Sequence, residues 1–190
     1  MDVLNPEAVI EDSLETAFSL RAYIDIISAI QEDGFTATPA FRKTFNGFYR
    51  VRQKPAAWYD KYYALMEEQR TVRRGFRELL ICLEPVSGTI DVSFVSKMMA
   101  AVDPTLPIWD RYVLQNLGFL KRWEQLSGRD KTLRIDEAER IYEDIKTWYA
   151  TFVRSKDGKA CIEAFDSAMP HYKEKLTAVK KIDYLLWSKR

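Results

Sequence analysis

Apolar residues recur three or four positions apart along almost the whole chain, the spacing that gives a helix one buried face. The first periodic segment begins at Asn5-Pro6-Glu7, where a capping residue, a proline and an acid form a helix start signal. Thr38-Pro39 has the same kind of signal and precedes an aromatic stripe. Pro55 opens the next segment, which runs to Leu83 either straight or bent near Arg70, and which Pro85 is expected to stop. The pattern predicts helices over 5–34, 38–53 and 55–83.

The second half of the chain shows the same periodicity after a turn-rich connection over 84–89. Strand-like alternation never persists, and no hairpin turn separates two β-rich runs. The predicted fold is therefore all-α, a two-lobed orthogonal bundle of seven to nine helices. We expect a single domain over 1–190 with a lobe boundary near 127–133. The further helices are predicted over 92–102, 108–118 and 136–154, after Gly158, and over 177–187.

Composition narrows the class of protein. The chain has 190 residues, of which 47% are hydrophobic and 30% charged, so it can bury a core without disulfides. The acidic N-terminus and the lack of a long apolar run predict a cytoplasmic protein with no membrane partner. Cys82, Cys161 and the single His171 lack the spacing of a metal site, so no metal or cofactor is expected.

A net charge of +1 argues against a globally basic nucleic-acid binder, but the charge is unevenly distributed. Residues 1–35 hold one basic and eight acidic side chains, whereas residues 36–83 hold ten basic and four acidic ones. Within the basic segment, four arginines follow helical spacing and are expected to share one helix face. They could bind phosphates, or they could pair with carboxylates, including those of the acidic first helix. These arginines are Arg70, Arg73, Arg74 and Arg77.

A second basic stretch, 48–54, interleaves Arg50 and Arg52 with aromatic residues and precedes Trp58 and Tyr62. Such interleaving suits a nucleic-acid strand, whose bases stack while its phosphates pair with arginine. The same aromatic residues at helical spacing also fit a buried core, and the core interpretation is favoured.

Asp110 follows the rigid loop 103–107 and lies at the start of a predicted helix. Its carboxylate could cap that helix or serve as the exposed acid of an active site. With Trp109 beside it, Asp110 is the candidate cleft residue.

Two segments of the chain, which together cover about 30 residues, resemble the helix-hairpin-helix DNA glycosylase superfamily. The resemblance lies in Val86-Ser87-Gly88-Thr89-Ile90-Asp91-Val92 and in Leu106-Pro107-Ile108-Trp109-Asp110-Arg111-Tyr112-Val113. It implies an all-α fold with two lobes and a cleft, a hairpin at Gly88, and Asp110 as the acid that stabilises a cationic sugar. The ending 179–187 is also similar to that of uncharacterised bacterial helical proteins with a serine-lysine helix.

The chain departs from the superfamily pattern at two places. Ile90 stands where the hairpin has its next glycine, and Val92 stands where bifunctional members have their lysine. Lys97, further along the same helix, is not at an equivalent position, so the resemblance implies no Schiff-base chemistry there.

Two functions follow from these patterns. The first is a glycosylase-like helical protein that binds the DNA or RNA phosphate backbone through its arginines, with Asp110 as the acting residue of a glycosylase-like hydrolase if the protein is an enzyme. The alternative is a non-enzymatic interaction module whose arginines pair with its own acidic N-terminal helix. The sequence predicts neither a particular base nor an oligomeric state.

Overall fold

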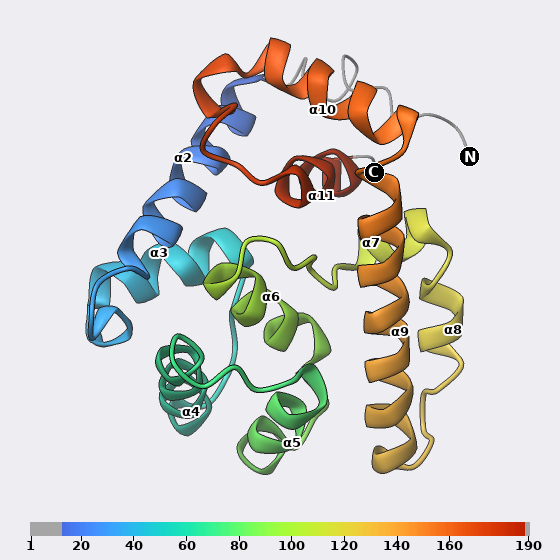
Figure 1. Ribbon diagram of the computed structural model, residues 1–190. Helices are drawn as coiled ribbons and strands as arrows, with labels where there is room; N and C mark the ends of the chain where they lie inside the picture. The colour runs from blue at the N-terminus through green and yellow to red at the C-terminus, as the bar shows by residue number, and fades with distance from the viewer. Residues whose placement is uncertain (1–12, 189–190) are drawn as a thin grey trace.

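The computed structural model describes residues 13–188, and this part of the chain is helical throughout, with no strand (Figure 1). The predicted all-α class is confirmed. Ten α-helices and two short 3-10 helices are present in the described residues, where seven to nine helices were expected. The helix start signal at Asn5-Pro6-Glu7 lies outside the described residues.

The first five described helices form one group. Helix α2 packs against α3, α4 packs against α5, and α5 packs against α6. A 3-10 helix, Phe35–Ala37, connects the first pair and contacts both α3 and α4. The bounds are α2 Ser13–Ala29, α3 Pro39–Tyr49, α4 Ala56–Glu68, α5 Phe76–Ser87 and α6 Val92–Val102.

The remaining helices form a second group around the long helix α9, which stands beside α7 and α8 in Figure 1. Helix α11 packs against both α10 and α7, and α9 joins the two groups by packing against α5. The bounds are α7 Arg111–Leu117, α8 Leu120–Glu124, α9 Lys131–Phe152, α10 Lys156–Ala168 and α11 Ala178–Ser188, with a 3-10 helix at Pro170–Tyr172 before α11.

Several helix ends follow directly from local chemistry. Asp110 caps α7 by accepting a hydrogen bond from the Tyr112 N–H at 2.9 Å, as its position predicted. The side chain of Asp130 caps α9 in the same way, so this helix begins at Lys131 rather than near Asp136. Gly118 ends α7 in the left-handed conformation that glycine adopts without strain.

The segment predicted over 55–83 is not one continuous helix, because the chain leaves the helical path between α4 and α5, near Arg70, where a bend is one of the two expected forms. Gln69 stabilises the break: its side-chain oxygen accepts from the Arg74 N–H at 2.7 Å, and its amide donates to the Arg74 carbonyl at 3.2 Å. The expected stop at Pro85 is wrong, since α5 continues through this proline to Ser87.

The core is rich in aromatic side chains, which confirms the core interpretation of the stripes. Trp58 is fully buried and stacks on Tyr62 with ring centres 4.6 Å apart, and Phe45 packs 6.0 Å from Tyr62. The buried hydrophobic residues of both helix groups belong to one continuous cluster. The turn over 125–130 joins α8 to α9, which contact each other. The single domain and the lobe boundary near 127–133 stay predictions.

The junction of α9 and α10 provides a test of this packing. A Cβ at Gly158 would lie 1.8 Å from the Phe152 carbonyl oxygen, whereas a Cβ at Gly47 in α3 meets nothing within 4 Å. We expect Gly158→Ala to lower the free energy of unfolding by at least about 2 kcal/mol. The control Gly47→Ala should raise it by up to about 1 kcal/mol. Urea denaturation measures both, and a neutral Gly158→Ala would contradict the described contact.

Candidate functional site

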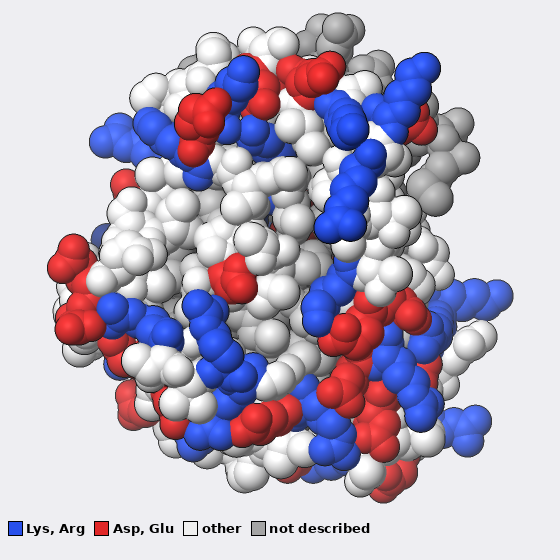
Figure 2. Space-filling model, in the orientation of Figure 1, with Lys and Arg blue, Asp and Glu red and all other residues white. Residues whose placement is uncertain are grey.

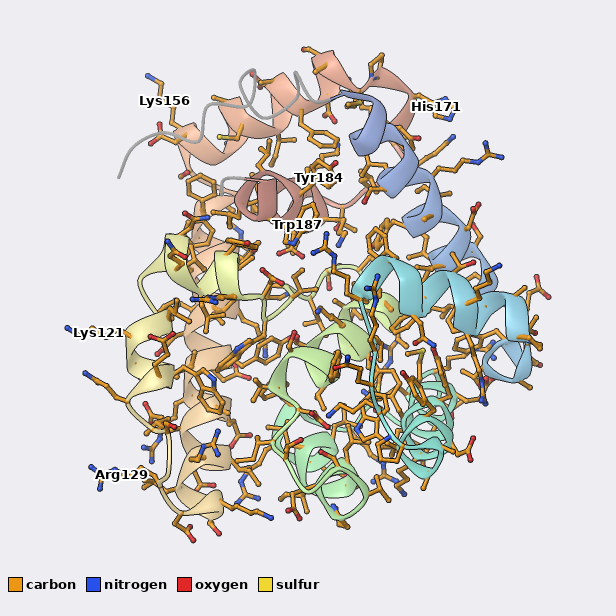
Figure 3. The ribbon with its side chains drawn as sticks, turned by 180° about the vertical axis from the view of Figure 1, so that it is seen from behind. Lys121, Arg129, Lys156, His171, Tyr184 and Trp187 are labelled. Atoms are coloured by element: carbon orange, nitrogen blue, oxygen red, sulfur yellow. The ribbon has the colours of Figure 1, made fainter. Side chains whose placement is uncertain are left out.

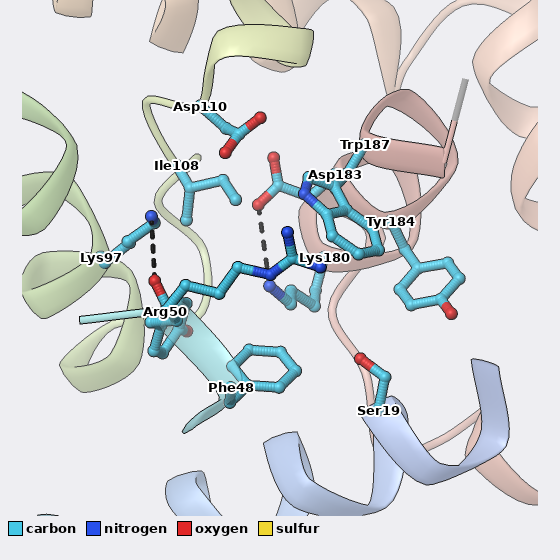
Figure 4. A pocket seen from close by; sticks show the side chains of 11 residues that line it. Ser19, Phe48, Arg50, Lys97, Ile108, Asp110, Lys180, Asp183, Tyr184 and Trp187 are labelled. Carbon is cyan, nitrogen blue, oxygen red and sulfur yellow. Dashed lines mark hydrogen bonds and ion pairs between the residues drawn. The ribbon is translucent and has the colours of Figure 1, made fainter. Parts of the chain in front are cut away.

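A pocket opens where the two helix groups meet (Figure 4). The end of α3, the middle of α6, the loop before α7 and one face of α11 form its walls. Its volume is about 90 Å³, enough to hold several water molecules or part of a ligand. The lining residues are Ser19, Phe48, Tyr49, Arg50, Lys97, Ile108, Asp110, Lys180, Asp183, Tyr184 and Trp187.

Asp110 lies in this pocket and caps α7 at the same time. The loop that carries it is held from two sides: the Trp109 N–H donates to Ser96 Oγ at 2.8 Å, and the Tyr142 hydroxyl donates to the Pro107 carbonyl at 2.9 Å. Because one Asp110 oxygen accepts the helix N–H, the orientation of the carboxylate is fixed. The two interpretations of Asp110, helix cap and pocket acid, therefore describe the same side chain.

Lys97 projects from α6 into the same pocket, where its ammonium donates to the Tyr49 carbonyl at 3.2 Å (Figure 4). Burial lowers the pKa of Lys97, and the nearby cations Lys180 and Arg50 lower it further, while the charge of Asp110 acts in the opposite direction. A lowered pKa increases the share of neutral, nucleophilic amine. The sequence alone placed Lys97 outside the site.

Asp183 contributes a second carboxylate from α11, and it is only 1% exposed. Its Oδ1 accepts a hydrogen bond from the Tyr149 hydroxyl of α9. Burial raises the pKa of Asp183 to about 6, although Lys180, Tyr149 and the backbone of Ile108 favour the charged form. No chemical motif in the sequence marks this residue, which lies in the C-terminal segment that resembles uncharacterised bacterial proteins.

Lys180 is one helical turn before Asp183 and is also buried. Its ammonium lies 4.5 Å from the centre of the Tyr23 ring and 5.6 Å from that of Phe48, so aromatic faces partly replace water around the charge. Burial lowers the pKa of Lys180 while Asp183 raises it. Three cations and two carboxylates thus line one pocket, with Arg50 as the third cation.

Arg50 stands at the mouth of the pocket as the C-cap residue of α3, in the left-handed region at φ 55°. Its guanidinium carbon lies 5.9 Å from the centre of the Trp187 ring. Figure 3 shows Trp187 on the side of α11 that faces the interior of the molecule. Arg52 is exposed in the following loop and does not line the pocket.

The four-arginine face does not exist as predicted, because Arg70, Arg73 and Arg74 precede α5 and only Arg77 lies within it. Arg70 pairs with Asp33 at 2.7 Å and also bonds the carbonyls of residues 31 and 32. The alternative interpretation pairs the arginines with the acidic N-terminal helix. The Asp33 contact is made by the turn that follows α2, not by the helix itself.

Arg74 and Arg77 form ion pairs with carboxylates outside the N-terminal segment. Arg74 binds Glu68 at 2.8 Å and also pairs with Glu78. Arg77 reaches across to Asp136 of α9 at 2.9 Å. Figure 2 shows the result on one face, where blue and red side chains interleave over the lower part of the molecule.

Arg73 is exposed, and no ion pair joins it to another described residue. It lines a separate, polar depression together with Arg70, Asp33 and Glu67, which shares no residue with the pocket around Asp110. Arg70 and Arg73 therefore do not form one site with Asp110, whereas Arg50 does line its pocket.

Two further predicted site residues have structural roles. Trp109, expected beside Asp110 at the cleft, is 3% exposed and packs 5.2 Å from Trp123, whereas its neighbours Ile108 and Asp110 line the pocket. Gly88 does occupy the turn between α5 and α6, at φ 66°, but its N–H donates to the Glu84 carbonyl at 2.7 Å. That N–H is therefore engaged within the turn.

Comparison with known proteins finds no matching family model, no similar curated protein and no similar solved structure. Across residues 13–188, no helix combines the length and the apolar character needed to cross a membrane. Among the same residues, no cluster of histidine, cysteine or carboxylate side chains could hold a metal ion. The side chains of the site itself are therefore the basis for inferring its chemistry.

The buried Asp183 carboxyl makes a testable contribution to stability. Because its pKa is about 6 in the folded protein and about 3.8 in the unfolded chain, the folded state binds the proton more tightly between these values. The stabilisation is present at pH 4 and is lost as the pH rises through 6. We expect the free energy of unfolding to gain on the order of 1 to 3 kcal/mol from pH 7 to pH 4, relative to Asp183→Asn. Denaturation at both pH values measures it, and equal pH dependence in the two proteins would contradict the raised pKa.

Proposed function

We propose that this protein acts on nucleic acid and cleaves the bond between a base and its sugar in the pocket that holds Lys97 and Asp110. The observation that carries the proposal is the presence of a desolvated amine and a fixed carboxylate in one pocket. An amine with a lowered pKa is a nucleophile, and a carboxylate in the same pocket can accept its proton or stabilise a cationic sugar. The resemblance at Asp110 and at the turn around Gly88 supports the same class of reaction.

In the proposed reaction, the neutral amine of Lys97 attacks C1′ of the sugar. The bond from C1′ to the base breaks, and the base leaves with the bonding electron pair and takes up a proton from solvent. Asp110 accepts the proton that the attacking nitrogen loses, and its charge stabilises the positive charge that develops on the sugar. Opening of the sugar ring then gives an imine between Lys97 and C1′, which water hydrolyses to release the amine.

The walls of the pocket suit a base that is turned out of its stack. Phe48, Tyr184 and Trp187 supply aromatic surface, and a flipped base is held by such rings. Arg50 at the mouth is placed to bind a phosphate, since a guanidinium matches phosphate oxygens with two hydrogen bonds. This assigns the phosphate contact to Arg50 and not to the paired arginines before α5.

The pairing of those arginines favours the second function, a non-enzymatic interaction module. Arg70, Arg74 and Arg77 are held by carboxylates of the chain itself, and these ion pairs connect the turn after α2, α4 and α9 with the region of α5. A non-enzymatic module gives the buried charges of the pocket no role. Burying these charges lowers stability, whereas apolar side chains at the same positions would not lower it. We therefore place the interaction module second.

Borohydride trapping tests the reaction directly. Sodium borohydride reduces an imine to a stable amine, so a reacting lysine becomes covalently attached to the DNA. With duplexes that contain uracil, hypoxanthine, 8-oxoguanine or an abasic site, we expect trapping by the wild type and none by Lys97→Met. Asp110→Asn should react at least about 100-fold more slowly. Denaturing gels measure both the strand products and the trapped complex.

Lys121→Met is the matched control, because Lys121 is exposed on α8 and points away from the molecule in Figure 3. It should trap DNA like the wild type. Circular dichroism checks that each variant is folded. Trapping that survives in Lys97→Met, or a folded wild type that acts on none of the four duplexes, would refute the proposal.

The phosphate contact is tested by the salt dependence of binding. We expect Arg50→Ala to reduce the slope of log affinity against log salt by about 1, which corresponds to one lost phosphate contact. Arg73→Ala, which removes an exposed arginine outside the pocket, should leave the slope unchanged. Fluorescence anisotropy with a labelled duplex gives both slopes. A loss at Arg73 and none at Arg50 would place the nucleic acid on the loop before α5 instead.

A further inference from the structure

Lys180 and Asp183 face each other across a gap inside the pocket. The distance from Lys180 Nζ to Asp183 Oδ2 is 3.9 Å, too long for a hydrogen bond (Figure 4). Oδ2 is buried and has no hydrogen-bond partner among the described residues, while Oδ1 of the same carboxylate is bonded to Tyr149. One oxygen of Asp183 is thus held by Tyr149, and the other lies near the Lys180 ammonium without closing a hydrogen bond to it.

Two other buried ion pairs among residues 13–188 have their charged atoms closer together. Lys54 and Asp91 are 2.7 Å apart, and Asp91 accepts a second hydrogen bond from Trp58. On α11 itself, Lys181 and Asp166 are 2.5 Å apart, although Asp166 Oδ1, like Asp183 Oδ2, has no aligned hydrogen-bond donor. A buried polar atom without a partner costs free energy, so an open pair in this setting needs a reason.

The space around the open pair suits a planar ring. Lys180 and Asp183 share the pocket with Phe48, Tyr184 and Trp187, so a ring that stacks against these side chains would present its edge to the pair. A group that donates to Oδ2 and accepts from Nζ would satisfy both atoms. Adjacent donor and acceptor atoms are characteristic of the hydrogen-bonding edge of a nucleobase.

We propose that Lys180 and Asp183 form a base-reading subsite: Asp183 Oδ2 accepts a hydrogen bond from a ring N–H of the base, and Lys180 donates to the carbonyl next to it. This inference rests on the proposed function, because it takes the ligand to be a base. It adds a division of roles. Residues of α11 select a base that carries a ring N–H donor, whereas α6 and the loop before α7 supply the reacting groups.

Two small bases that differ only at the relevant atom test the subsite. In 1-methyluracil the methyl group occupies the position of the sugar and the ring N3–H remains, whereas 1,3-dimethyluracil has lost this donor. We expect 1-methyluracil to bind the full chain at least about tenfold more tightly, the usual effect of a hydrogen bond to a charged group. Titration followed by NMR measures both dissociation constants and shows whether the shifted signals come from α11.

Asp183→Asn is the informative variant. Its side-chain oxygen can still accept from Tyr149, but an NH₂ group takes the place of Oδ2 and donates where the carboxylate accepts. We expect 1-methyluracil to bind this variant at least about tenfold more weakly, with 1,3-dimethyluracil unaffected. Equal binding of the two bases to the wild type, binding of neither, or unchanged binding of 1-methyluracil to the variant would each overturn the subsite. The comparison on the wild type needs no variant to fold.

The two proposals fail separately. Binding of a free base requires no bond cleavage, so selective binding without borohydride trapping would leave the subsite standing and remove the reaction. Trapping that depends on Lys97, without any preference between the two uracils, would leave the reaction standing and remove the subsite.

Discussion

The buried carboxylate of Asp183 is the interaction on which the arrangement of the site depends. It joins α11 to Tyr149 of α9 and interacts with the backbone of Ile108, two residues before Asp110. A further hydrogen bond joins α7 to α11: the Asn116 side-chain amide donates to the Leu186 carbonyl at 2.9 Å. Because these contacts position α11 against the loop that carries Asp110, the two carboxylates of the pocket are placed by one set of interactions. A charge buried in this way lowers stability by itself, and the bonds to its oxygen offset part of that cost.

Much of the fold could be predicted because its signals are local. Pro39 and Asp110 mark helix starts through backbone geometry and capping, and both are where the sequence placed them. A bend near Arg70 can be expected from the sequence, but the full break between α4 and α5 depends on a specific bond between Gln69 and the backbone of Arg74, which periodicity does not register. The early start of α9 differs from the expectation because the Asp130 side chain caps this helix, whereas the residues 127–130 favour a loop.

The site could be predicted only in part, because its members are brought together by tertiary packing. Asp110 carried a positional signal, and Arg50 was found among the basic residues before α4. Lys97 was set aside by its position along the helix, yet the loop between α6 and α7 folds back and brings Asp110 to the same pocket. The ion pairs of the arginines also depend on long-range contacts. Arg77 pairs with Asp136, which is 59 positions away, and a count of local charge does not reveal such a partner.

The proposed reaction requires Lys97 to be a desolvated amine coupled to Asp110 within one pocket, and an NMR pH titration of the Lys97 amine tests this coupling most directly. We expect a midpoint below the ordinary lysine value of 10.5 in the wild type. We also expect a lower midpoint still in Asp110→Asn, because the carboxylate charge that favours the ammonium has been removed. A midpoint at the ordinary value that does not respond to Asp110→Asn would contradict this coupling.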